Sequence, residues 1–248
     1  MPDALGWRAK FGVLAPSTNT IVEPDFYCMN VPGVTCHFSR IHIRDQNLGS
    51  DAAFEALLEQ VRSEIQYAVE RVLTAEPDYM VMGMSSETFW GGVEGNRQFI
   101  KQIKELTGGM GVATGAEACE RALQLFGAKR IGVVTPYQPI GDENVERFFN
   151  EIGFDVVKIK GLRCPTAVSI ARVQENELRD ALLEVNSHDV DVLVQAGTNL
   201  SMVRLADEAE RWLNKPVMAI NAAIWWMALR ENGMQDKLYG CGRLLREF

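Results

Sequence analysis

The chain has 248 residues, of which 47% are hydrophobic and 23% charged, and its formal net charge is -8 at pH 7. This composition suits an ordinary folded core. The excess of acidic residues argues against a nucleic-acid partner. No apolar run reaches the ~18 residues needed to span a membrane, so we expect no membrane partner. Five scattered cysteines without a CxxC spacing predict neither a disulfide framework nor a metal site, and the N-terminus lacks the features of a secretory signal, so we expect a cytoplasmic protein.

Short apolar runs alternate with stretches of helical periodicity along the chain. In the first half, strands are expected over 11–16, 34–44, 77–84 and 112–114, and helices over 52–75, 96–106 and 117–126. In the second half, strands are expected over 130–135, 155–162, 190–196 and 217–220, and helices over 143–152, 175–185, 202–214 and 222–230. This alternation predicts an α/β fold with parallel sheets and right-handed crossovers.

Three segments of the first half recur in the same order in the second half. The pairs are 11–16 with 131–136, 78–86 with 191–199, and 111–114 with 216–219. The repeat predicts two similar parallel-sheet lobes related by pseudo-twofold symmetry, with a ligand held between them. We expect the first lobe in residues 1–120, completed by the C-terminal 221–248, and the second lobe in residues 121–220.

Polar residues follow four of the predicted strands, two in each lobe, where ligands bind in open parallel sheets. The four loops are 17–19, 85–88, 135–138 and 198–201. If the lobes face each other, these loops bring hydroxyls, amides and backbone N–H groups to one space, which suits a carboxylate or an oxyanion derived from it. The alternative interpretation is that small polar residues only turn the chain or cap the next helix.

The segment 12–20, followed by Glu23, resembles the opening of maleate cis-trans isomerases and arylmalonate decarboxylases. The segments 135–137, 198–200 and 239–245 also resemble that family, so the similarity covers nearly the whole chain. It implies membership of the aspartate/glutamate racemase superfamily, with the active site between two α/β lobes, no cofactor and no metal. It further implies a small carboxylate substrate, and we expect a homo-oligomer.

The resemblance also implies roles for individual residues. The residues expected to hydrogen-bond a carboxylate or enediolate are Ser85, Ser86 and Tyr137. The residues expected to bind substrate are Ser17, Asn19, Met84, Gly197, Thr198 and Asn199. Glu87 is a further candidate acid or base if burial raises its pKa, with a first-turn helix carboxylate as the alternative.

The chain departs from the family at the two positions where catalytic cysteines are expected, which hold Met84 and Gly197. A thioether has no proton to donate and glycine has no side chain, so the usual thiol chemistry is missing there. Cys164 is the one remaining cysteine that we consider for the pocket, with a buried structural thiol as the alternative. Phe89 and Trp90 are expected either to form an apolar wall or to pack in the core.

Together these observations predict a cofactor-independent enzyme acting on a small carboxylate or dicarboxylate. Maleate-type cis-trans isomerisation is the main expectation. The alternatives are arylmalonate-type decarboxylation, ester or amide hydrolysis with the same oxyanion pocket, and a carboxylate-binding protein without activity.

Overall fold

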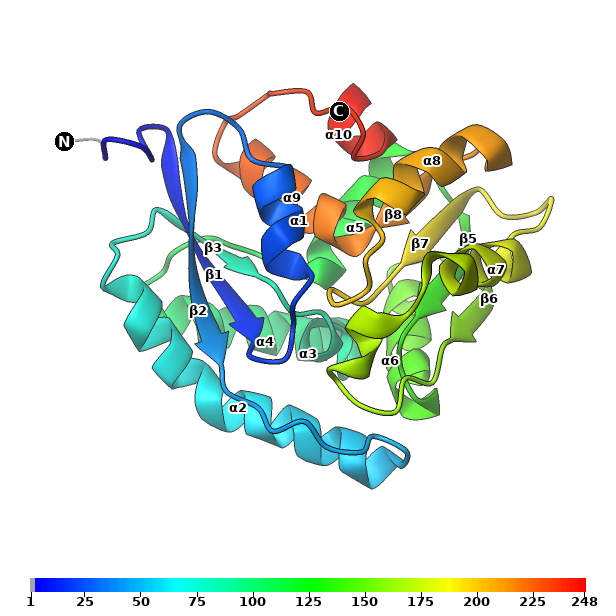
Figure 1. The fold of residues 1–248 in the computed structure, drawn as a ribbon, viewed down its shortest axis with the longest axis horizontal. Helices are drawn as coiled ribbons and strands as arrows, with labels where there is room; N and C mark the ends of the chain where they lie inside the picture. The colour runs from blue at the N-terminus through cyan, green and yellow to red at the C-terminus, as the bar shows by residue number, and fades with distance from the viewer. Residues whose placement is uncertain (1–2) are drawn as a thin grey trace.

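The computed structural model describes residues 3–248 as two α/β lobes, each built on a four-stranded parallel sheet (Figure 1). The first sheet has the order β2-β1-β3-β4 and contains β1 (Ala9–Pro16), β2 (Val34–Ile41), β3 (Tyr79–Met82) and β4 (Val112–Ala113). The second sheet has the order β6-β5-β7-β8 and contains β5 (Arg130–Thr135), β6 (Asp155–Gly161), β7 (Val192–Gln195) and β8 (Val217–Ala219). The two orders are equivalent, so the predicted fold class is confirmed.

The longer helices flank these sheets and agree with the predicted ones to within a few residues. They are α2 (Asp51–Leu73), α4 (Gly92–Leu106), α5 (Gly115–Leu125), α6 (Pro139–Glu151), α7 (Glu175–Val185), α8 (Val203–Leu213) and α9 (Ile220–Glu231). Four short helices were not predicted: α1 (Val22–Cys28), α3 (Ser86–Phe89), η1 (Ser169–Arg172) and α10 (Arg243–Glu247). None of them exceeds 7 residues, which is too short for helical periodicity to show.

Side-chain caps fix where several helices begin. Ser50 accepts a hydrogen bond from the Ala53 N–H at 3.2 Å and starts α2. Thr114 accepts one from the Glu117 N–H at 3.3 Å and starts α5. Each cap satisfies a backbone donor that the helix itself leaves unpaired, so the direction of each helix away from its sheet is set by the preceding loop.

Helix α9 follows the last strand of the second sheet but packs against the first lobe. The ring of Trp225 stacks on Phe26 with centroids 5.1 Å apart and meets Phe11 edge-on at 5.5 Å. Its indole Nε1 donates a hydrogen bond to the Met29 carbonyl at 2.6 Å. This fully buried tryptophan therefore joins the second half of the chain to the first sheet and to α1.

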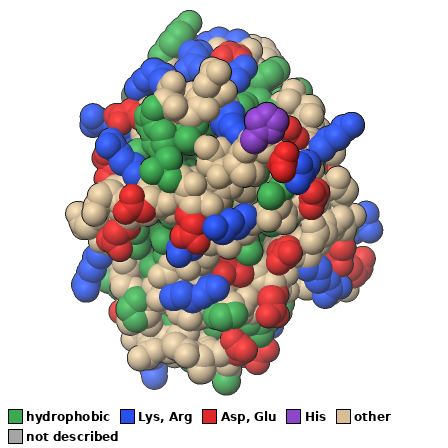
Figure 2. Space-filling view, turned by 90° about the vertical axis from the view of Figure 1, so that its right-hand side faces the viewer, with side chains coloured by type: hydrophobic (Ala, Val, Ile, Leu, Met, Phe, Trp, Pro, Cys, Tyr) green, Lys and Arg blue, Asp and Glu red, His purple; other side chains and the backbone are tan. Residues whose placement is uncertain are grey.

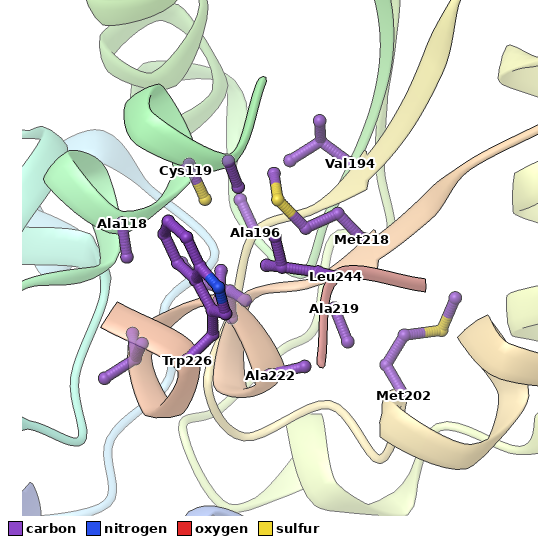
Figure 3. Close-up of a cluster of buried hydrophobic side chains, with 14 of the residues drawn as sticks. Ala118, Cys119, Val194, Ala196, Met202, Met218, Ala219, Ala222, Trp226 and Leu244 are labelled. Atoms are coloured by element: carbon purple, nitrogen blue, oxygen red, sulfur yellow. The ribbon is translucent and has the colours of Figure 1, made fainter. Parts of the chain in front are cut away.

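Helix α5 makes the corresponding contact in the other direction. Ala118 and Cys119 of α5 lie in the same buried cluster as Val194 and Met218 of the second sheet (Figure 3). Each lobe thus contributes its last long helix to a shared apolar core. This sharing limits independent movement of the lobes.

The C-terminal segment contacts both lobes. Arg8 near β1 forms an ion pair with Asp236, with 2.6 Å between N and O, whereas α10 is bound to α8 through Glu210, which accepts from the Arg243 N–H at 2.9 Å. From these contacts we propose that α9 completes the first lobe and that α10 belongs to the second lobe. The sequence analysis assigned all of 221–248 to the first lobe, so this proposal assigns a shorter segment to it.

On the face shown in Figure 2, acidic and basic side chains are interspersed. That face therefore lacks the extended basic surface typical of nucleic-acid binding. Within residues 3–248, no helix is both long and apolar enough to cross a membrane.

We expect Trp225→Ala to lower the free energy of unfolding by about 3–5 kcal/mol, because it removes a large buried side chain from the core shared by the lobes. Denaturant unfolding followed by circular dichroism measures this change. The control is Trp212→Ala, since Trp212 is 44% exposed and its replacement should change stability by less than roughly 0.5 kcal/mol. Equal effects of the two substitutions would contradict the proposed role of Trp225.

Candidate active site

A cavity opens where the carboxyl ends of the strands of both sheets meet. All four predicted polar loops contribute to its lining. The volume within which the centre of a water molecule can move is about 60 Å³. The residues from these loops, together with the residue that directly precedes three of them, are Pro16, Thr18, Asn19, Met84, Ser85, Ser86, Pro136, Tyr137, Gln138, Gly197, Thr198 and Asn199. The residues from elsewhere are Ile43, Leu48, Phe54, Leu57, Val61, Cys164, Ala167 and Ile170.

The lining has two chemically different parts. One is a group of hydroxyl side chains, which we call the hydroxyl cluster: Ser85, Ser86, Tyr137 and Thr198. The other is an apolar wall from α2 and the loops beside it: Ile43, Leu48, Phe54, Leu57, Val61 and Ile170. No Lys, Arg, His, Asp or Glu occurs among the described residues that line the cavity, so a bound anion would be met by uncharged donors.

The hydroxyl cluster joins the two lobes. Ser85 follows β3 of the first sheet, and its Oγ lies 2.7 Å from the Tyr137 hydroxyl oxygen of the second lobe. The backbone N–H of Thr198, after β7, donates to the same Ser85 Oγ at 3.2 Å. Three loops from two sheets therefore meet at a single oxygen atom.

Some hydroxyl hydrogens of this cluster are not used within the protein and are available to a ligand. Ser85 and Tyr137 share one hydrogen bond between two hydroxyls, so one hydroxyl hydrogen of the pair is left over whichever of them donates. Thr198 Oγ1 accepts from Asn19 Nδ2 at 3.0 Å and keeps its own hydrogen. Ser86 lines the cavity and caps no helix. Three hydroxyl hydrogens can thus be directed at the oxygens of a carboxylate.

Two asparagines at the cavity edge use their amides inside the protein. Asn19 Oδ1 accepts from the backbone N–H groups of Ile21 and Val22, each at 3.0 Å, at the start of α1. Asn199 Oδ1 accepts from the Thr20 N–H at 3.0 Å. The amide of Asn19 therefore holds Thr198 and α1 in place, and its expected contact with a substrate carboxylate stays a prediction.

Tyr137 is fixed through its backbone as well as its hydroxyl. Its N–H donates to Thr135 Oγ1 at 3.1 Å, and its carbonyl accepts from the guanidinium of Arg163. Both partners also hydrogen-bond the buried carboxylate of Asp142. Burial raises the pKa of the Tyr137 phenol, with the Ser85 hydrogen bond opposing and the Asp142 charge adding to the shift, so the phenol keeps its proton at neutral pH.

Two of the predicted site residues lie outside the cavity lining. The Ser17 hydroxyl pairs with the backbone of Ile43, donating to its carbonyl at 3.2 Å and accepting from its N–H at 3.1 Å. The Glu87 carboxylate forms an ion pair with Arg62 of α2 at 2.7 Å. Burial raises the pKa of Glu87 while Arg62 lowers it. Because neither side chain lines the cavity, we do not include them in the proposed machinery.

The apolar wall is formed by residues other than the expected Phe89 and Trp90. Phe89 packs in the core against Phe148, with ring centroids 5.3 Å apart. Trp90 stacks behind Phe54 at 5.9 Å. Phe54 itself reaches the cavity and meets the Tyr137 ring edge-on at 5.7 Å. The sequence signal for Phe54 was its place on the buried face of the long helix, which does not distinguish a cavity wall from ordinary core.

The two positions at which the resemblance places cysteines line the cavity as Met84 and Gly197. Gly197 has a φ of +151°, a backbone conformation that side chains rarely adopt. A Cβ built on Gly197 would lie 2.6 Å from Cδ of Pro136. A cysteine is therefore sterically excluded at this position unless Pro136 moves.

Gln138 and Cys164 also line the cavity. Gln138 belongs to the predicted polar loop 135–138, directly follows Tyr137, and its Nε2 donates to the Cys164 carbonyl at 3.1 Å. Cys164 is the cysteine that the sequence analysis considered for the pocket, with a buried structural thiol as the alternative. Among residues 3–248, no group of three or more His, Cys, Asp or Glu side chains is arranged to hold a metal ion.

The chain is similar to known proteins over almost its whole length. A model of the arylmalonate decarboxylase family matches residues 24–245. A maleate isomerase of Pseudomonas putida is 26% identical over 248 residues, which cover 95% of this chain and 96% of that protein. A maleate isomerase of Nocardia farcinica is 22% identical over 245 residues, with 96% of each protein covered.

Solved structures of the same two kinds of enzyme share the fold. A cysteine-to-serine mutant of Nocardia farcinica maleate cis-trans isomerase, with a covalently bound succinylcysteine intermediate, has a TM-score of 0.86 at 21% identity and covers 96% of this chain and 98% of its own. A double mutant of arylmalonate decarboxylase in a liganded form has a TM-score of 0.78 at 21% identity, with 95% of this chain and 97% of its own covered. At these identities the structures support the fold.

We expect Gly197→Ala to lower the melting temperature, because the new Cβ both strains the backbone and meets Pro136. Backbone strain of this kind costs about 1–3 kcal/mol, and each kcal/mol lowers the melting temperature by roughly 2–4 °C in a chain of this size. The matched control is Gly153→Ala, where φ is also positive, at +90°, but no atom lies within 4 Å of the new Cβ. Equal shifts in differential scanning calorimetry would mean that the Pro136 contact is unimportant.

Proposed function

The chain belongs to the arylmalonate decarboxylase family, and we propose that it is a cofactor-independent isomerase or lyase that acts on a small carboxylate or dicarboxylate. The observation that carries this proposal is the hydroxyl cluster, which joins both lobes at one oxygen and leaves hydroxyl hydrogens facing a cavity. Donors held in place before the reaction stabilise an oxyanion without reorganising.

The cluster suits an enediolate, the species formed when a carboxylate accepts an electron pair from the adjacent carbon. Charge then builds up on two carboxylate oxygens. Hydrogens from the Ser85–Tyr137 pair, Ser86 and Thr198 are placed to stabilise both of them. Because the described lining opposite the cluster is the apolar wall, these hydrogen bonds act in surroundings of low polarity, where they are stronger than in water.

Cis-trans isomerisation of a maleate-type diacid is the first reaction that we propose. The similarity to maleate isomerases over 95% of the chain supports this choice. Rotation about a carbon–carbon double bond requires that the bond become single for a time. Addition of water to one alkene carbon forms a C–O bond and sends the electron pair of the double bond into an enediolate, which the hydroxyl cluster stabilises. Rotation about the resulting single bond, followed by expulsion of the same water oxygen, restores the double bond in the other geometry.

Decarboxylation is the second candidate, and the apolar wall favours it. A carboxylate placed against Leu48, Phe54 and Leu57 finds no donor among these side chains. Loss of water from a charged group without a replacement partner raises its energy. Departure as neutral carbon dioxide removes that penalty and leaves an enediolate at the hydroxyl cluster.

Proton NMR in heavy water with purified protein tests the proposal directly. Maleate, phenylmalonate and muconate-type diacids are the substrates to compare. We expect one class to show a change of double-bond geometry or loss of carboxylate with deuterium at the product carbon. Thermal stabilisation by these acids without any turnover would instead identify a carboxylate-binding protein, and ester turnover would identify a hydrolase.

We expect Tyr137→Phe to lower kcat/KM by roughly 10²–10³-fold, the usual effect of removing one oxyanion donor. The loss should fall mainly on kcat, since the hydrogen bond strengthens as charge builds up in the transition state. Tyr67→Phe is the matched control, because Tyr67 is 52% exposed and remote from the cavity lining. A loss below roughly tenfold, about 1.4 kcal/mol, would remove Tyr137 from the proposed machinery.

We retain two further expectations as proposals, a cytoplasmic location and a homo-oligomeric state. Size-exclusion chromatography with light scattering tests the second.

A further inference from the structure

We infer that the Cys164 thiol is the acid that delivers a proton to the substrate carbon in this cavity. The inference rests on the proposed function, because it requires an enediolate at the hydroxyl cluster. It places the acid on the loop after β6, and so away from the two strand ends that hold Met84 and Gly197.

The backbone of Cys164 is fixed to the residues on either side of Tyr137. Its N–H donates to the Pro136 carbonyl at 3.0 Å, and its carbonyl accepts from Gln138 Nε2 at 3.1 Å. A residue bound through both its backbone groups has little freedom to move relative to its partners. The backbone of Cys164 is therefore held at a constant position relative to Tyr137, and both residues line the cavity.

The residue before the cysteine reinforces this arrangement. Arg163 adopts a positive φ of 54°, and its guanidinium donates to the Tyr137 carbonyl and to the Asp142 carboxylate. Asp142 is 5% exposed and also accepts from the Thr135 hydroxyl. The end of β5, the start of α6 and the loop after β6 are thus joined at one corner by an ion pair whose carboxylate, Asp142, is buried while Arg163 is partly exposed.

The same corner contributes a second residue to the cavity lining. Gln138 is only 9% exposed and lines the cavity. Its Nε2 donates to the Cys164 carbonyl, so Gln138 and Cys164 form one hydrogen-bonded edge of the space that also holds the hydroxyl cluster.

The chemical state of the thiol fits an acid better than a nucleophile. Cys164 is buried, and desolvation raises its pKa to about 11, so it carries its proton at neutral pH. Nucleophilic attack requires the thiolate, whereas proton donation requires the thiol. The other four cysteines do not line the cavity, so Cys164 is the one thiol among the described residues with access to a ligand there.

Decarboxylation of a dicarboxylate produces the carbon that Cys164 would protonate. The carbon–carbon bond to the leaving carboxylate breaks, carbon dioxide departs, and the electron pair passes to the remaining carboxylate as an enediolate. The S–H bond of Cys164 then breaks, its proton forms the new C–H bond, and the enediolate returns to a carboxylate. Water reprotonates the thiolate, so one proton is taken from solvent in each cycle.

The test compares wild type with Cys164→Ala and Cys164→Ser, using phenylmalonate turnover and binding measured separately. General acids contribute roughly 10²–10⁴-fold, so we expect a fall of that size in kcat for Cys164→Ala, with the affinity for phenylmalonate changed little. Cys164→Ser, which keeps a hydroxyl of similar size, shows whether shape alone restores the rate. Cys28→Ser is the matched control, since Cys28 is exposed and outside the cavity lining.

The outcomes separate this inference from the proposed function. If wild type turns over phenylmalonate and Cys164→Ala is equally active while folded by calorimetry, the inference is wrong and the proposed function stands. Alkylation of wild-type Cys164 by iodoacetamide at alkaline pH, followed by mass spectrometry, should be slowed by substrate and accompanied by loss of turnover. Full turnover after alkylation of Cys164 would contradict the inference. Absence of both binding and turnover in wild type with every diacid would overturn the proposed function together with the inference.

Discussion

The meeting of Ser85, Tyr137 and Thr198 at one oxygen atom is the contact on which the site depends. A hydrogen bond of this kind contributes only about 1 kcal/mol net, so it does not itself hold the lobes together. The shared apolar core does, through Trp225 of α9 on the first lobe and Cys119 of α5 on the second. Packing of α9 and α5 thus fixes the two lobes relative to each other, and the polar contact depends on that fixed arrangement. Loosening of the core would therefore separate the donors that the two lobes contribute.

The absence of cations from the described cavity lining has a chemical consequence. A lysine or arginine would bind the resting carboxylate tightly, and binding of the ground state does not by itself raise kcat. Neutral hydroxyls hold a resting carboxylate less strongly, and their contribution grows as charge builds up on its oxygens. Together with the apolar wall of Phe54 and Leu57, they favour reactions in which one carboxylate gains charge while another is lost or left without partners.

The sequence predicted the fold well because the duplicated α/β unit repeats its signals. Each strand that is followed by small polar residues appears twice, so the four loops and their meeting point followed from the pattern, and Asn19, Ser85, Tyr137 and Thr198 all line one cavity. Contacts between segments far apart in the sequence were harder to predict. The ion pair of Glu87 depends on where α2 brings Arg62, which no local pattern near the loop indicates.

Pro136 links the two least predictable features of the site. Its ring occupies the space that a side chain at position 197 would need, with Cδ 2.6 Å from the Cβ of a built side chain. Its carbonyl accepts the Cys164 N–H at 3.0 Å. One residue thus closes a strand-end position to thiol chemistry and also anchors the only thiol among the described lining residues. Because loops of both lobes line one small space, the two-lobe fold can keep its oxyanion donors while the proton source moves to another loop.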